Sequence, residues 1–154
     1  MLPLGASVVL LVVHAVSAAI WVGGLVAIFV VARVASATLD TGQRIAFFRA
    51  LGRAYGIVGG LALLVALASG AVLLDDHPWD GLLTATAIVA GCLLAVTVAG
   101  IAQAKAMTRL RRRALQTPDL GERVRRGAVL AGLLRSAIGL LTLTLVVLGA
   151  ALVA

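Results

Sequence analysis

Long apolar stretches without charge alternate along the chain with short charged ones. Residues 6–32, 54–74, 81–104 and 136–154 contain no Asp, Glu, Lys or Arg. A helix needs roughly 20 apolar residues to cross the hydrocarbon core of a membrane, so most of these stretches suffice as they stand. The last one extends back to about residue 127, because only Arg135 interrupts it and a long side chain can reach the interface. The pattern predicts transmembrane helices over about 6–33, 54–74, 81–106 and 127–153.

The overall composition agrees with this reading. Of the 154 residues, 62% are hydrophobic and 12% are charged, whereas soluble domains average about 45–50% apolar and about 25% charged residues. We therefore expect an all-α integral membrane protein whose residues 1–154 form a single transmembrane domain, a four-helix bundle.

The distribution of basic residues predicts the orientation. The connectors after the first and third predicted spans hold twelve of the thirteen Lys and Arg residues, whereas the connector 75–80 holds none. Basic connectors stay in the cytoplasm, so both termini should lie outside. Abundant Ala, Val, Gly and Arg with one Lys point to a bacterial plasma membrane. The net charge of +7 then indicates contact with anionic lipid head groups rather than nucleic acid, for which no recognition motif is present.

The two basic connectors share a short motif. Residues 38–44 and 117–123 both read T-x-D-x-G-[QE]-R, at an offset of 79 residues, and the same offset aligns Gly70 with Gly149. This predicts two duplicated helical hairpins, with repeat halves 1–75 and 80–154. The alternative is ordinary turn and helix-capping chemistry in a biased composition. The offset places Leu93 opposite His14, so the halves would differ in their polar residues.

The first predicted span carries the strongest candidate for chemistry. His14 lies about 12 Å below the outer end of that helix at 1.5 Å per residue, and an ionisable residue at such depth indicates function. Ser17, Trp21 and Gly24 follow on the same helical face and should point into the bundle with it. His14 would be an axial haem ligand or a metal ligand in a cavity lined by this stripe. The alternative is an interhelical hydrogen bond.

Three further residues could hold a ligand. His77 lies among aspartates in the outer connector, where carboxylates and an imidazole could capture a metal ion such as copper, although the same residues suit a tight solvated turn. Cys92 lies at a depth near that of His14 and could be a metal ligand or a small apolar filler. Arg135 could clamp a haem propionate or another anion, or simply extend to the interface.

Residues 13–25, with the pattern H-x6-W-x-G-G over His14, Trp21, Gly23 and Gly24, resemble the opening helix of bacterial CopD-like membrane domains and related four-helix membrane families. A more distant likeness is to the HemJ-type protoporphyrinogen oxidases, although the second His and the Pro-Arg pair associated with that oxidase are missing. The resemblance implies a role for His14 in binding b-type haem or copper.

We therefore expect a bacterial inner-membrane protein that binds b-type haem or copper through His14, in copper handling or electron transfer. No residue is assigned a catalytic role. The alternatives are a non-catalytic subunit or assembly factor, which binds other membrane proteins or further copies of itself through its small-residue faces, and a porphyrinogen-oxidising enzyme.

Overall fold

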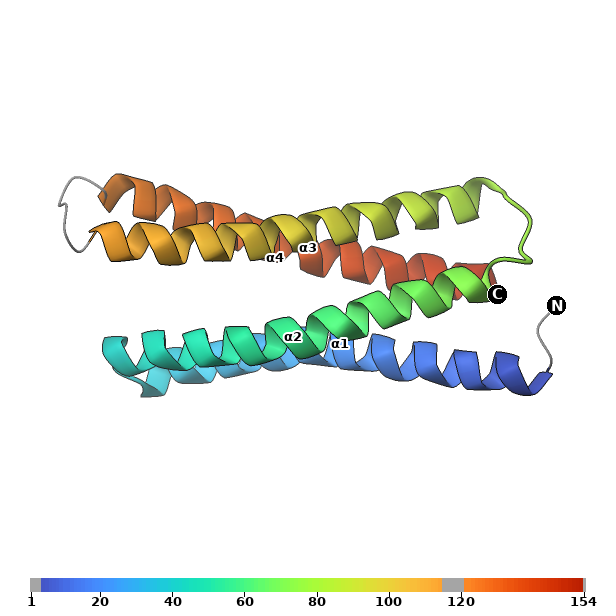
Figure 1. Cartoon of the computed structure of the whole chain (residues 1–154), viewed down its shortest axis with the longest axis horizontal. Helices are drawn as coiled ribbons and strands as arrows, with labels where there is room; N and C mark the ends of the chain where they lie inside the picture. Colours follow the sequence, from blue (N-terminus) through green and yellow to red (C-terminus); the bar gives the residue numbers. More distant parts are fainter. Residues whose placement is uncertain (1–3, 115–120, 154) are drawn as a thin grey trace. The chain divides into compact units, whose positions relative to one another are not determined.

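The protein is all-α. A computed structural model describes residues 4–114 and 121–153 and contains four helices in that part of the chain (Figure 1): α1 (Leu4–Thr38), α2 (Thr41–Leu73), α3 (Gly81–Ala114) and α4 (Gly121–Val153). Each contains a segment long and apolar enough to cross a membrane. The prediction of an all-α chain with four spanning helices is therefore confirmed.

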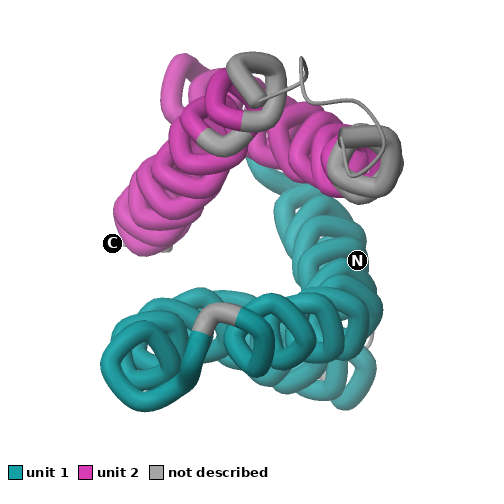
Figure 2. Tube along the Cα trace, turned by 90° about the vertical axis from the view of Figure 1, so that its left-hand side faces the viewer, with its two compact units in different colours: residues 1–77 teal, residues 78–154 magenta. Residues whose placement is uncertain are grey.

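The four helices pair into two hairpins. The chain divides into two compact units, Met1–His77 and Pro78–Ala154, coloured separately in Figure 2. In the first unit α1 packs along α2, and in the second α3 packs along α4. The two units are described separately below.

Aspartate caps explain where two of the helices begin. The side chain of Asp40 accepts a hydrogen bond from the backbone N–H of Gln43 at 2.8 Å, and Asp80 accepts one from the N–H of Leu83 at 2.7 Å. A carboxylate at this position satisfies an N–H group that the first helical turn leaves without a partner. Asp40 and Asp80 therefore start α2 and α3.

The helices extend beyond the predicted membrane spans. The apolar stretch of the second predicted span begins at residue 54. Before it, Ile45, Phe48 and Leu51 recur every three residues among arginines, a pattern that predicts a separate interfacial amphipathic segment. In the structure these residues belong to α2, which runs without a break from Thr41. Arginines favour helix almost as strongly as Ala does. The charged residues therefore mark where the apolar stretch ends, whereas the helix itself continues.

The outer surfaces of both hairpins are apolar. Many large side chains are more than half exposed, among them Phe29, Val58, Val98 and Leu140. Water would strongly disfavour such a surface, whereas lipid tails are as apolar as these side chains. α1 has 35 residues and a length of about 50 Å, so it can cross a core of about 30 Å and project beyond it.

The helices of the second hairpin meet through Leu93, Met107 and Gln103 of α3. Leu93 of α3 is completely buried, and the side chain of Met107 lies directly against Gly127 of α4. A polar contact also crosses the seam, in which the Nε2 amide group of Gln103 donates a hydrogen bond to the carbonyl of Gly127 at 3.1 Å. Helices in membranes pack closely where a small residue admits a neighbouring side chain.

The offset of 79 residues also relates the buried faces of the two hairpins. It pairs His14 with Leu93, Trp21 with Gly100 and Gly24 with Gln103, and all six residues are buried or half-buried. α2 and α4 have the same length of 33 residues. Duplication itself stays a prediction. The second copy of the repeated motif, at 117–123, lies largely outside the described residues, and nothing is known of its side chains.

Candidate functional site

One face of α1 carries the polar residues singled out above, and it points toward α2. Ser17 and Trp21 are only 8% and 6% exposed, while His14 and Gly24 are half-buried. Their spacing of three and four residues places them on a single helical face. The stripe therefore lies along the seam of the first hairpin, as its periodicity predicts.

The imidazole of His14 is held by the backbone of α2. Its Nδ1 lies 3.0 Å from the carbonyl oxygen of Ala66 and 3.2 Å from Oγ of Ser69. A carbonyl oxygen can only accept, so Nδ1 must carry the proton and donate it. In the neutral ring this leaves Nε2 with a free lone pair. No described residue forms a hydrogen bond with Nε2.

Ser69 supports the same arrangement. Its hydroxyl lies 2.6 Å from the carbonyl of Val65 and 3.1 Å from that of Ala66, both of which can accept its proton. The oxygen of Ser69 then keeps a lone pair that can accept from Nδ1–H of His14. Ser69 is only 5% exposed, so this small network is shielded from solvent.

A small residue on α2 makes room for the ring. A Cβ atom on Gly70 would lie 3.1 Å from Cε1 of His14 and 3.4 Å from its Nδ1. Most side chains at this position would push the imidazole away from α2 and lengthen its hydrogen bond to Ala66. Gly70 therefore lets the ring lie against the helix that orients it.

A second contact holds the hairpin together further along the seam. The hydroxyl of Tyr55 on α2 donates a hydrogen bond to the carbonyl of Trp21 on α1 at 2.9 Å, and the two rings stack with centroids 6.5 Å apart. The Tyr55 ring lies against Gly24 of α1 and Gly59 of its own helix. Hydrogen bonds thus run in both directions, from α1 to α2 at His14 and from α2 to α1 at Tyr55.

Sequence reasoning missed the two partners on α2. Tyr55 is the single tyrosine of the chain and lies four residues before Gly59, a combination that indicates a ring packed over a small residue. Ser69 directly precedes Gly70, and a hydroxyl inside an apolar span was the available signal for a buried polar contact. Neither signal says that the partners are His14 and Trp21.

The connector between α2 and α3 forms a turn. The N–H of His77 donates to the carbonyl of Leu74 at 3.0 Å, and Asp75 makes a similar backbone contact with Val72. Asp80 caps α3 through one carboxylate oxygen. This geometry agrees with the alternative of a tight solvated turn, and metal capture by His77 stays a prediction.

The remaining two predicted residues lie in the second unit. Cys92 is an exposed free thiol on α3, and Arg135 is exposed on α4. The described residues contain no group of three or more His, Cys, Asp or Glu side chains that could hold a metal ion.

Comparison with known proteins does not identify a family for this chain. No model of a known protein family, no curated protein and no solved structure matches the chain.

Proposed function

We propose that the protein is a multi-pass protein of the bacterial plasma membrane that binds b-type haem through Nε2 of His14. The observation that carries the proposal is the 3.0 Å contact between Nδ1 of His14 and the carbonyl of Ala66. Metal-binding histidines commonly donate their second ring N–H to a carbonyl or carboxylate, which fixes the tautomer and makes the other nitrogen a better ligand. The contact of Nδ1 with Ala66 would therefore leave Nε2 as the nitrogen that binds the haem iron.

The surroundings of His14 fit a haem ligand. The imidazole is half-buried and packs closely against Gly70, so its orientation is fixed before any ligand binds. Haem iron needs one strong axial ligand from a chain, and proteins commonly provide it as a neutral imidazole. Bound haem would supply one-electron redox chemistry. His14, Ala66 and Ser69 would hold and orient it, and their hydrogen bonds would tune its potential.

Haem is favoured over copper by the number of ligands that each requires. Copper sites in proteins are built from several imidazole or sulfur ligands. Within the described part of the first hairpin, the imidazole of His14 forms hydrogen bonds only with the hydroxyl of Ser69 and the carbonyl of Ala66. Copper handling through His14 and porphyrinogen oxidation remain alternatives implied by the resemblance to CopD-like and HemJ-type proteins. His77 and Cys92 remain candidate metal ligands by residue type.

A second function is favoured by the same contacts. The hydrogen bonds from His14 to α2 also hold the hairpin together, as polar residues do between membrane helices. In that case the protein would be a non-catalytic subunit or assembly factor, with His14 as a structural residue. Haem binding requires Nε2 of His14 as a ligand, whereas the structural role requires only the hydrogen bonds of Nδ1.

The test compares absorption spectra of the full chain, purified in mild detergent from cells supplied with haem precursor. Spectra are recorded in the oxidised and dithionite-reduced states, for wild type and for His14→Asn. Asparagine places an N–H group near the position of Nδ1 and has no counterpart of Nε2. Ser69→Ala is the matched control, because it alters the same network without removing the ligand.

The proposal expects a Soret band and reduced α and β bands in wild type and in Ser69→Ala, and their loss in His14→Asn with little change in thermal stability. Haem retained at full stoichiometry in His14→Asn would overturn the assignment. A featureless wild-type spectrum with no bound metal would favour the structural subunit. Copper detected by elemental analysis would favour copper handling, and turnover of an added porphyrinogen would favour the oxidase.

A further inference from the structure

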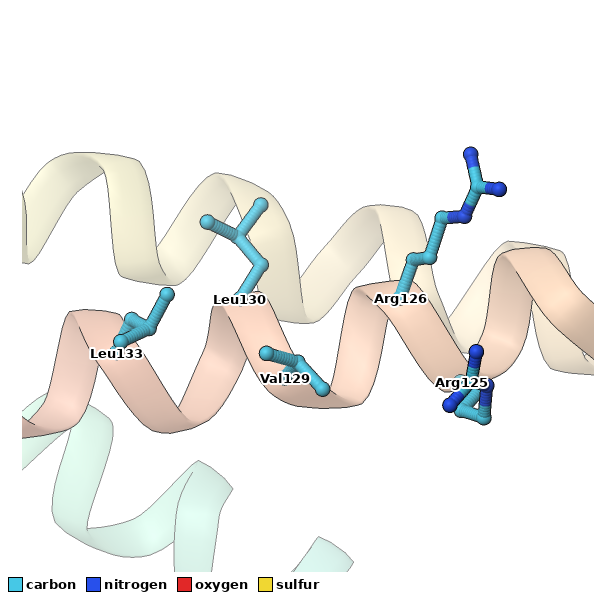
Figure 3. A pocket seen from close by; sticks show the side chains of 5 residues that line it. All are labelled: Arg125, Arg126, Val129, Leu130 and Leu133. Atoms are coloured by element: carbon cyan, nitrogen blue, oxygen red, sulfur yellow. The ribbon is translucent and has the colours of Figure 1, made fainter.

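Polar groups of α2 converge on one edge of the His14 imidazole. The carbonyl oxygen of Ala66 and Oγ of Ser69 lie 3.0 Å and 3.2 Å from its Nδ1. The shallow groove on α4 shows no such convergence, because a single helix forms it and its two guanidinium groups point apart (Figure 3). That groove is lined by Arg125, Arg126, Val129, Leu130 and Leu133. The contacts of His14, in contrast, join two helices of one hairpin.

The residue at position 70 limits how closely the ring can approach α2. A Cβ atom on Gly70 would lie 3.1 Å from Cε1 and 3.4 Å from Nδ1 of His14. A methyl group there would move the ring by a few tenths of an ångström, and a larger branched side chain would move it further. The hydrogen bond from Nδ1 to Ala66 would then lengthen and weaken.

The position of the ring also decides which nitrogen carries its proton. A neutral imidazole has one N–H group, and hydrogen-bond acceptors determine the nitrogen on which it lies. Ala66 and Ser69 accept at Nδ1, whereas no described residue forms a hydrogen bond with Nε2. A ring held away from both acceptors can carry the proton on Nε2 instead. Nε2 then has no lone pair for a metal ion.

We infer that Gly70 is a positioning residue for His14: it admits the ring to Ala66 and Ser69, which keeps the proton on Nδ1 and leaves Nε2 unprotonated. Gly70 has no side chain to offer a ligand, so it acts only through His14. Its effect on the proton belongs to the chain without cofactor. The consequence for ligand binding rests on the proposed haem site.

The experiment uses ¹⁵N NMR of the cofactor-free full chain in lipid bilayers at about pH 8, where an ordinary imidazole is neutral. Both ring nitrogens are labelled, and a His77→Gln background leaves His14 as the single histidine. The test variant is Gly70→Val, with Gly70→Ala as the smaller change. Gly60→Val is the matched control, because it adds the same side chain to α2 about 15 Å away. A Cβ atom at Gly60 would meet no atom of its own hairpin within 4 Å. Haem affinity is measured on the same samples.

We expect a protonated Nδ1 in the background chain and in Gly60→Val. Gly70→Val should change the ratio of the two tautomers about fivefold in favour of Nε2–H, the equivalent of one net hydrogen bond, and should weaken haem binding by a similar factor. Gly70→Ala should lie between, and it decides by the same comparison if Gly70→Val does not fold.

Equal tautomer ratios in the Gly70 and Gly60 variants, or a protonated Nε2 in the background chain, would overturn the inference. A ratio that shifts in Gly70→Val, in a chain whose background form binds no haem, would support the inference and contradict the proposed function. The two failures are therefore distinguishable.

Discussion

At the scale of single residues, the first hairpin is organised by two side chains that cross its seam. His14 donates to Ala66 from α1, and Tyr55 donates to Trp21 from α2. Both donors sit where a glycine admits a ring, Gly70 for His14 and Gly24 for Tyr55. In a low-dielectric setting such contacts are stronger than in water, and a buried partner left unpaired is costly. These residues therefore determine the register of α1 against α2.

Replacing Gly24 should show how tightly the Tyr55 ring is held. A Cβ atom at Gly24 would overlap that ring, which cannot move away without losing its hydrogen bond to Trp21. Gly24→Ala should therefore lower the free energy of unfolding in detergent by about 1–3 kcal/mol, the usual cost of overpacking. Thermal unfolding followed by circular dichroism measures this directly.

The neighbouring glycine gives a matched control. A Cβ atom at Gly23 would meet nothing within 4 Å, so Gly23→Ala should leave stability unchanged or slightly raised. Removing the ring with Tyr55→Leu should also make Gly24→Ala harmless. If Gly23→Ala and Gly24→Ala were equally destabilising, the close packing of Tyr55 against α1 would be wrong.

At the scale of helices, α2 is the element that differs most from the prediction. It begins at the Asp40 cap and continues through a segment with three arginines before it enters its apolar stretch. Arg44, Phe48, Leu51 and Tyr55 are half-buried, whereas Ile45 and Phe47 are exposed. An interfacial segment would group Ile45 with Phe48 and Leu51, since those three share its apolar side. The continuous helix groups Arg44 with them instead.

Spin labelling can distinguish these two arrangements of α2. Because Cys92 is the only cysteine, Cys92→Ser provides a background for single labels at residues 44, 45, 47, 48 and 51. Labels at 44, 48 and 51 should be immobilised against α1, and labels at 45 and 47 should move more freely. A label at 45 as immobile as those at 48 and 51, with a mobile label at 44, would support the separate interfacial segment.

At the scale of the whole molecule, the two hairpins each consist of two long apolar helices but differ in the side chains that they bury. The first has His14, Trp21 and Gly24 on its seam, and the second has Leu93, Gly100 and Gln103 at the corresponding positions. Leu93 is fully buried and offers no ligand. His14 is thus the only histidine within the predicted spans, and we expect one cofactor per chain.

The predicted orientation of the chain in the membrane has its own test. Both basic connectors should lie in the cytoplasm, because Lys and Arg next to spans are retained there. Alkaline phosphatase fused after Ala154 should therefore be active in a bacterial host, whereas fusion after Thr38 should give an inactive enzyme. A fluorescent protein that folds only in the cytoplasm should give the reverse pattern. Activity after Thr38 without activity after Ala154 would contradict the orientation.

Much of the fold could be predicted because short stretches of sequence are enough to identify each helix and its buried face. Uncharged stretches gave the four spans, and the spacing of His14, Ser17 and Trp21 gave the face that meets a neighbour. The partners could not be predicted in the same way. The contact of His14 with Ala66 joins residues 52 positions apart, and it depends on the register of two helices, which no short pattern encodes. The start of α2 was missed because charge ends a membrane span without ending a helix.

The most direct test of the central claim is a titration of cofactor-free protein with haem. Wild type should saturate at one haem per chain, with a shifted Soret band, since Nε2 of His14 would provide the one imidazole ligand within the predicted spans. His14→Asn should lose this saturable binding while its thermal stability stays close to that of wild type. Binding by His14→Asn with unchanged stoichiometry and affinity would contradict the assignment of His14 as the ligand.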